Sequence, residues 1–151
     1  MKRLLLALAL LTFALPALAD TTSYQRKGRS AVGVQEYYWY NCDTDDQIVT
    51  GTQSDAIYGY IITFKVVPDS SNPPDASWSL VLRDENNFDW LFGEATALDG
   101  TDATNSANID VPVTDAAGLG YLHGERLTPY ASGMGTTYNN CYYLYIRVKE
   151  K

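Results

Sequence analysis

Histidine and cysteine are both scarce in this 151-residue chain, which has one histidine and two cysteines. A hydrolase triad needs an oriented base beside a nucleophile, and His123, next to Gly124 at an expected turn, is a poor source of that base. Two thiolates and one imidazole also make a poor metal site. We therefore predict no catalytic residues, no metal site and no cofactor, and expect that the protein is not an enzyme.

Basic side chains are also in short supply, with 11 Lys and Arg against 18 Asp and Glu and a formal charge of −7. Nucleic acids are bound through clustered Lys and Arg, which displace counterions from the phosphates. The acidic balance therefore disfavours nucleic acid as a partner.

Long apolar runs are confined to the first 19 residues, MKRLLLALALLTFALPALA. A basic start, an apolar stretch from Leu4 to Leu15 and a small-x-small ending at Ala19 are typical of a secretory signal peptide. The apolar stretch is shorter than the roughly 20 residues that span a bilayer, which disfavours a retained anchor. We predict that residues 1–19 are a cleaved signal peptide. The mature protein is then exported, periplasmic or extracellular, with no membrane contact.

Tyrosine, by contrast, is abundant, with 12 copies alongside three tryptophans. Aromatic and β-branched runs broken by Gly, Asn, Asp and Ser clusters indicate an all-β domain. In AIYGYIITFKVV, alternation predicts a half-buried strand whose apolar face carries Tyr58, Tyr60, Ile62, Phe64 and Val66. Its other face carries Gly59, Thr63 and Lys65. The proline-rich PDSSNPPD that follows predicts a loop.

The next segment, SWSLVLRDENNFDWLF, predicts a β-hairpin. One face of its first arm carries Trp78, Leu80 and Leu82, residues 84–87 form the turn, and one face of its second arm carries Phe88, Trp90 and Phe92. Residues 93–108 are expected to form a loop or an edge segment. Further strands are predicted at residues 109–113, 121–123 and 127–130, followed by a turn at 131–137 and a last strand at 138–148.

These seven or eight short strands predict a single antiparallel β-sandwich over residues 34–151, with a small β-barrel as the alternative. Residues 20–33 are expected to be a flexible N-terminal segment. The 132 residues left after signal cleavage are enough for one domain with one core.

Both cysteines belong to strands dense in tyrosine, YYWYNC near the start of the mature chain and NNCYYLYIRV at its end. Alternation places four side chains on the core side of the last strand: Tyr142, Leu144, Ile146 and Val148. The outer side of that strand carries Cys141, Tyr143, Tyr145 and Arg147. The early strand divides in the same way into one face with Tyr37 and Trp39 and another with Tyr38, Tyr40 and Cys42. If the two strands are neighbours, Cys42 meets Cys141 on the outer face.

An even number of cysteines in an exported protein is most simply a disulfide, because the extracytoplasmic compartment is oxidising. A Cys42–Cys141 bond would close a loop of about 100 residues, which the chain-entropy model values at roughly 4–5 kcal/mol. Redox-active pairs usually have CxxC spacing, so we predict a structural bond and not free or reactive thiols.

The same alignment surrounds the disulfide with four tyrosines: Tyr38, Tyr40, Tyr143 and Tyr145. We predict that they form a binding patch, because Tyr buries a large area and keeps a hydroxyl for hydrogen bonding. The alternative is a second layer of core, covered by the loop at 93–108.

Two acidic clusters have spacings that a calcium loop uses: Asp43, Asp45 and Asp46 in CDTDD, and Asp84, Asn86 and Asp89 in DENNFD. Neither has the full twelve-residue pattern, and Asx-type turns explain both more simply. A glycosidase would need two carboxylates from Glu36, Glu94 and Glu125 at a suitable spacing in space. We predict neither a calcium site nor such a pair.

The run DAIYGYIITFKVVPDSSNPPDASWSLVLRDENNFDWLFGEATAL resembles a set of small phage-encoded proteins found among virion genes. In that set, a strand that ends in a proline-bearing loop is followed by a strand with the pattern L-x-D-E/A-x-G-x-D. Residues 82–89 occupy this position, with Asn87 where Gly is usual. The closing LYIRV and the early YYWY are also similar to the set, so the resemblance covers about residues 37–148.

The resemblance implies a small β-sandwich that acts as an auxiliary or decorating virion component, without catalytic residues. The signal peptide and the cysteine pair depart from the pattern of the set. Localisation to the virion is therefore the expectation only if the chain is phage-encoded.

Two classes of function follow. In the first, the protein is a non-enzymatic structural or interaction module that binds a protein surface or itself. The alternative is an exported module that binds carbohydrate or the cell surface, in which aromatic rings stack on sugars. The family-like pattern favours the first class, and the export signal favours the second.

Overall fold

The structure is a computed structural model that describes residues 20–28, 33–43, 48–75, 77–93, 95–98, 120–135 and 140–150. Eight strands form in these ranges, and they are arranged in two antiparallel sheets. The predicted all-β fold is confirmed. No helix of membrane-spanning length and hydropathy occurs in the part of the chain that the structure describes.

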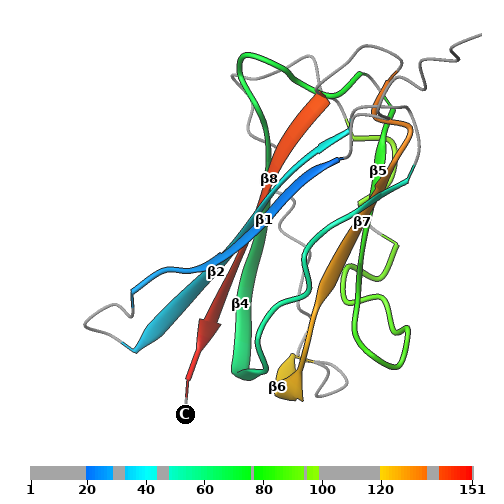
Figure 1. Cartoon of the computed structure of the whole chain (residues 1–151). Coiled ribbons are helices and arrows are strands. Elements are labelled where there is room, and N and C mark those ends of the chain that lie inside the picture. Colours follow the sequence, from blue (N-terminus) through cyan, green and yellow to red (C-terminus); the bar gives the residue numbers. More distant parts are fainter. Residues whose placement is uncertain are drawn as a thin grey trace, which may run out of the picture.

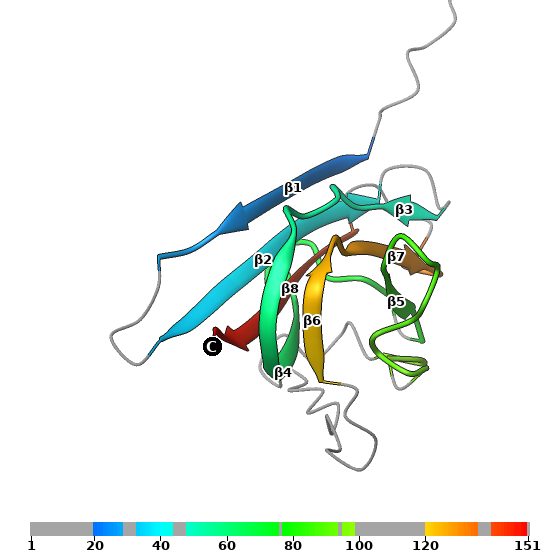
Figure 2. The same ribbon diagram turned by 90° about the horizontal axis from the view of Figure 1, so that it is seen from below.

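The larger sheet has five strands, in the spatial order β1 (Thr21–Arg26), β2 (Val34–Asp43), β8 (Asn140–Lys149), β4 (Ile57–Pro68) and β6 (Tyr121–Glu125). The smaller sheet has the order β3 (Val49–Thr50), β7 (Thr128–Ser132) and β5 (Ser79–Arg83). In Figure 1 the larger sheet is a curved layer, and β5 and β7 lie across from it. Figure 2 shows β6 leading directly into β7, so the chain passes from one sheet to the other at this corner.

The core lies between the two sheets and follows the predicted alternation on three strands. The predicted inner side chains of β2 and β8 are all buried: Tyr37, Trp39, Tyr142, Leu144, Ile146 and Val148. Leu80 and Leu82 of β5, and Trp78 just before that strand, contribute to the core from the opposite side, also as predicted. Burial of these large apolar side chains supplies the main driving force for folding.

Strand β4 departs from the predicted alternation at Ile62. Its pairing with β8 shifts between Ile61 and Thr63, as expected for a β-bulge, in which one extra residue reverses the faces of the residues that precede it. The predicted burial of Phe64 and Val66 is confirmed, but that of Tyr58, Tyr60 and Ile62 was wrong, because their exposed fractions are 59%, 51% and 48%.

Only the first arm of the predicted hairpin forms a strand. After β5 ends at Arg83, residues 84–93 are mostly turns, joined to β5 by an isolated bridge between Arg83 and Asp89. The predicted common face of Phe88, Trp90 and Phe92 is therefore wrong: Trp90 is buried and the two phenylalanines are exposed.

Local hydrogen bonds explain why this segment turns. Asp84 Oδ1 accepts from the backbone N–H groups of Asn86 and Phe88, and Asp89 accepts from those of Leu91 and Gly93. Such bonds compete with a strand ladder. The predicted Asx-type turns are confirmed for this cluster. Asn87 has φ of 65°, in the left-handed region that Gly and Asn tolerate best.

The N-terminal segment is more ordered than predicted, so the expectation of a flexible segment was wrong for residues 21–26. They form β1, which pairs with β2 from Thr21 opposite Cys42 to Arg26 opposite Tyr37. This edge strand, with the sequence TTSYQR, contacts the core through Tyr24. It therefore has no alternating apolar pattern from which a strand could be predicted. Residues 1–19 and 109–113, for which a signal peptide and a strand are predicted, lie outside the described residues.

Buried tyrosines make the stability of the fold sensitive to alkaline pH. Tyr142 is fully buried, and burial raises the pKa of its hydroxyl, which accepts a hydrogen bond from Asn41 Nδ2 at 3.0 Å. Burial, aided by the charge of Asp55, raises the pKa of Tyr24 to about 12. Above about pH 10 the unfolded chain loses these protons and the folded chain keeps them, so unfolding is increasingly favoured.

We expect the free energy of unfolding to fall as the pH rises above about 10. At about pH 11, each tyrosine that keeps its proton in the folded state should lower this free energy by up to about 1.4 kcal/mol. Urea unfolding of wild type and Tyr142→Phe at about pH 8 and about pH 11 measures the effect. The variant should lose less stability than wild type between these two conditions. An equal loss in both proteins would remove Tyr142 as a cause.

Candidate functional site

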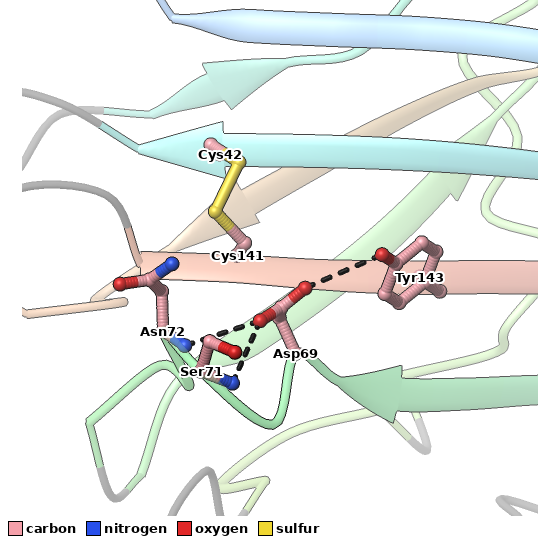
Figure 3. Close-up of a disulfide and its surroundings, with 6 residues drawn as sticks. All are labelled: Cys42, Asp69, Ser71, Asn72, Cys141 and Tyr143. Atoms are coloured by element: carbon pink, nitrogen blue, oxygen red, sulfur yellow. Dashed lines mark hydrogen bonds between the residues drawn. A yellow bond between two sulfur atoms is a disulfide. The ribbon is translucent and has the colours of Figure 1, made fainter.

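The predicted disulfide is present and joins β2 to β8. Cys42 and Cys141 lie directly opposite each other in the ladder, on the outer side of the sheet, and their sulfur atoms are bonded. Figure 3 shows the turn after β4, with Asp69, Ser71 and Asn72, lying beside this bond. The two cysteines are only 5% and 1% exposed, so the disulfide is a structural part of this face.

The four predicted tyrosines form two cross-strand pairs on the same outer face. Tyr38 lies opposite Tyr145 and Tyr40 opposite Tyr143, with ring centroids 5.8 and 4.7 Å apart. Along β8, the rings of Tyr143 and Tyr145 are 6.2 Å apart and nearly parallel. These four side chains, the outer tyrosine patch, are all partly buried. Their rings pack against each other, and part of each side chain remains accessible to solvent.

Two hydroxyl groups of the patch, those of Tyr40 and Tyr143, act as neutral hydrogen-bonding groups. Tyr143 Oη donates to Asp69 Oδ2 at 3.3 Å (Figure 3). Burial, together with the charge of Asp69, raises the pKa of both Tyr143 and Tyr40. These phenols therefore stay protonated near neutral pH and suit binding better than acid–base chemistry.

A groove of about 580 Å³ lies beside the patch and crosses β2, β8 and β4. It is lined by Lys27, Glu36, Thr63, Lys65, Val67, Tyr145 and Arg147. Glu36 accepts from Lys27 Nζ through Oε1 and from Arg147 Nε through Oε2, both at 3.0 Å. Burial alone would raise the pKa of Glu36, but the two hydrogen bonds outweigh it and hold the pKa below its ordinary value. We call this the cationic groove, since it combines three cations with one carboxylate.

Lys27 connects the cationic groove to the tyrosine patch. Its Nζ lies 5.0 Å from the ring centroids of both Tyr38 and Tyr145, close enough for cation–π attraction. The hydrogen bond to Glu36 raises the pKa of Lys27. Sequence reasoning placed Lys65 and Arg147 on outer faces but missed the groove, because Lys27 belongs to the segment expected to be flexible.

The bulge in β4 adds an exposed aromatic row to the same face, made of Tyr58 and Tyr60, with the exposed Ile62 beside it. Tyr60 lies opposite Lys149 of β8 and opposite Tyr121 of β6. The rings of Tyr60 and Tyr121 pack edge to face, with their centroids 4.7 Å apart. Sequence reasoning placed this row in the core. The adjacent pair Ile61-Ile62 was the available signal, because strict alternation does not accommodate two neighbouring apolar residues.

Among the described residues, the carboxylates considered for catalysis lie on separate strands. Glu36 lies on β2 and Glu125 on β6, so at least three strand spacings, or about 14 Å across the sheet, separate them, which exceeds the separation of a glycosidase pair. His123 is exposed on β6, where its ring packs against Tyr121. Glu94, Asp45 and Asp46 lie outside the described residues. Within the described ranges, no group of three or more His, Cys, Asp or Glu side chains is placed to hold a metal ion.

The fold and the site together define a two-sheet β protein with an aromatic and cationic outer face. Comparisons of the chain with protein-family models, with curated proteins and with solved structures found no match. A proposal on function therefore depends on the chemistry of this face.

Proposed function

We propose that this protein is an exported, non-enzymatic interaction module that binds a protein surface, of a partner or of a second copy, through the outer face of the five-stranded sheet. The observation that carries the proposal is the gathering of seven tyrosines and Arg147 on one sheet face: the four of the outer tyrosine patch, the two of the exposed aromatic row, and Tyr121. Tyr and Arg are the residues most enriched in the centres of protein interfaces. Exposed aromatic side chains grouped on one face mark such sites.

The setting of this module is part of the proposal. The disulfide supports export, because such bonds persist mainly in oxidising compartments. The resemblance of the central segment to phage-encoded proteins supports a role as an auxiliary virion component. The left-handed backbone at Asn87 supports that likeness, since Gly, the usual residue there, adopts this conformation easily.

The exposed aromatic row provides the most direct test. We expect a Tyr58→Ser/Tyr60→Ser variant to lose at least about tenfold in affinity for the partner, because two exposed aromatic contacts of an interface are removed. The measurement is quantitative capture by the immobilised mature protein from purified virions or from cell-surface proteins, together with light scattering for self-association. Ile48→Ser is the matched control, since Ile48 is 63% exposed and borders the smaller sheet. Equal capture and self-association by wild type and the double variant would refute the proposal.

A second variant, Tyr40→Ser/Tyr145→Ser, distinguishes contact from packing in the outer tyrosine patch. Each side chain belongs to a cross-strand ring pair, and such pairs contribute roughly 0.5–1.5 kcal/mol. Lost stability with unchanged capture would identify the patch as a packing layer. Lost capture at an unchanged melting temperature would identify it as part of the contact surface.

Carbohydrate is the second candidate ligand, because the cationic groove places the ring of Tyr145 beside the hydrogen-bonding groups of Thr63 and Arg147. A glycan array with the purified mature protein tests this function. A specific signal that is lost in Tyr145→Ala would favour it over protein binding.

A further inference from the structure

We propose that the cationic groove binds an acidic peptide segment of the partner, whose Asp or Glu carboxylates pair with Lys65 and Arg147. This inference rests on the proposed function, because it names the part of a protein partner that meets the outer face. The charge of the groove is the first observation. Three cations face one carboxylate there, although the chain as a whole has a formal charge of −7. The groove is thus a local positive site on an acidic protein, and it attracts anions.

The donors needed for a bound carboxylate are available in the groove. Both oxygens of Glu36 are already engaged, one by Lys27 and the other by Arg147. Arg147 uses only its Nε for this bond, so among the described residues its terminal Nη groups have no acceptor. Lys65 likewise makes no ion pair with any described residue. A guanidinium fork and an ammonium group side by side are well suited to a carboxylate.

The strand register brings these two donors together. In the β4–β8 ladder, Thr63 lies opposite Arg147 and Lys65 opposite Tyr145, so Lys65 and Arg147 are diagonal neighbours on one face. Diagonal positions are roughly 7–8 Å apart, within reach of two long side chains that bind the same group. Two like charges at this spacing repel each other, and a carboxylate between them would relieve the repulsion.

The surroundings of the groove favour a peptide over an acidic sugar. A saccharide would stack on an aromatic face, and Lys27 Nζ, 5.0 Å from the ring centroids of Tyr38 and Tyr145, competes for the rings nearest the groove. Val67 and the nearby exposed aromatic row instead offer apolar contacts for the side chains that flank the acidic residues of a peptide. Aromatic anchors beside a charged rim are typical of protein interfaces.

The probe for this test is an acetylated, amidated hexaglutamate peptide, titrated into the isotope-labelled mature protein with its disulfide intact. We expect backbone amide shifts at residues 63–67 and 145–147, and none with hexaglutamine. Lys65→Gln should weaken hexaglutamate binding about tenfold, since one charge-assisted contact is lost. Lys149→Gln is the matched control, because it removes the same charge from the same face outside the groove, and binding should change less than about twofold.

Three results would overturn the inference: no shifts at the groove, equal weakening by Lys65→Gln and Lys149→Gln, or tighter binding of hexagalacturonate at the same residues. The last result would assign the groove to an acidic saccharide. The Tyr58→Ser/Tyr60→Ser variant should bind hexaglutamate normally, since neither residue lines the groove. Failure of the peptide test while partner capture still depends on the aromatic row would refute the groove assignment alone. Peptide binding without any partner capture would refute the proposed function alone.

Discussion

A variant with both cysteines replaced by alanine is expected to lose about 4 kcal/mol of unfolding free energy. Cys42 and Cys141 are separated by 99 residues, and the bond between them removes the freedom of that long loop from the unfolded chain. The bond also holds β2 against β8, and among the described strands β1 pairs with β2 alone. Its loss should therefore loosen the N-terminal edge of the sheet first.

Urea unfolding of the oxidised protein, the reduced protein and the Cys42→Ala/Cys141→Ala variant measures this effect. The reduced protein and the variant should agree within about 1 kcal/mol, because both lack the same loop constraint. Hydrogen exchange should show the largest gain in β1 and β2. An unfolding midpoint that is the same with and without reductant would show that the disulfide does not stabilise the fold.

Truncation of Trp39 to alanine should be about as destabilising, with an expected loss of roughly 3–5 kcal/mol. Trp39 is completely buried, and its ring lies 5.2 Å from that of Tyr24 on β1. Its Nε1 also donates to the carbonyl of Thr52 at 2.7 Å. Alanine leaves a cavity in the core, withdraws the contact that holds β1 and leaves that carbonyl without its donor.

Trp39→Phe is the control that separates packing from hydrogen bonding, because it keeps an aromatic ring and removes the indole N–H. We expect it to lose about 1–2 kcal/mol, clearly less than Trp39→Ala. Circular dichroism should follow the unfolding, since the change removes a fluorophore. Equal losses in the two variants would show that the contribution of Trp39 comes mainly from its hydrogen bond.

The two faces of β2 and β8 thus have different roles. Trp39 and Tyr142 on the inner face hold the sheets together, whereas Tyr38 and Tyr145 on the outer face are proposed to meet a partner. Changes on the inner face should reduce stability and those on the exposed aromatic row should reduce binding. This separation makes the proposed function testable with folded variants.

Alternation along a single strand was enough to predict part of this structure from the sequence. The apolar side chains of Leu144, Ile146 and Val148 alternate without interruption, so their burial and the outward direction of Cys141 could be predicted. Two cysteines allow one intramolecular bond, and their equal parity on neighbouring strands placed it correctly. These features are local, because a strand exposes alternate residues whatever it pairs with.

Features that depend on the register between distant segments could not be predicted in this way. The bulge at Ile62 exists relative to β8, some 80 residues later in the chain, and it exposes Tyr58 and Tyr60. Strand β1 is an edge strand that carries few apolar side chains, so its pairing with β2 has no periodic signal. The cationic groove combines Lys27, just after β1, with side chains of β4 beyond the bulge and of β8. Its position follows from hydrogen-bond pairing across strands, which alternation within one strand does not specify.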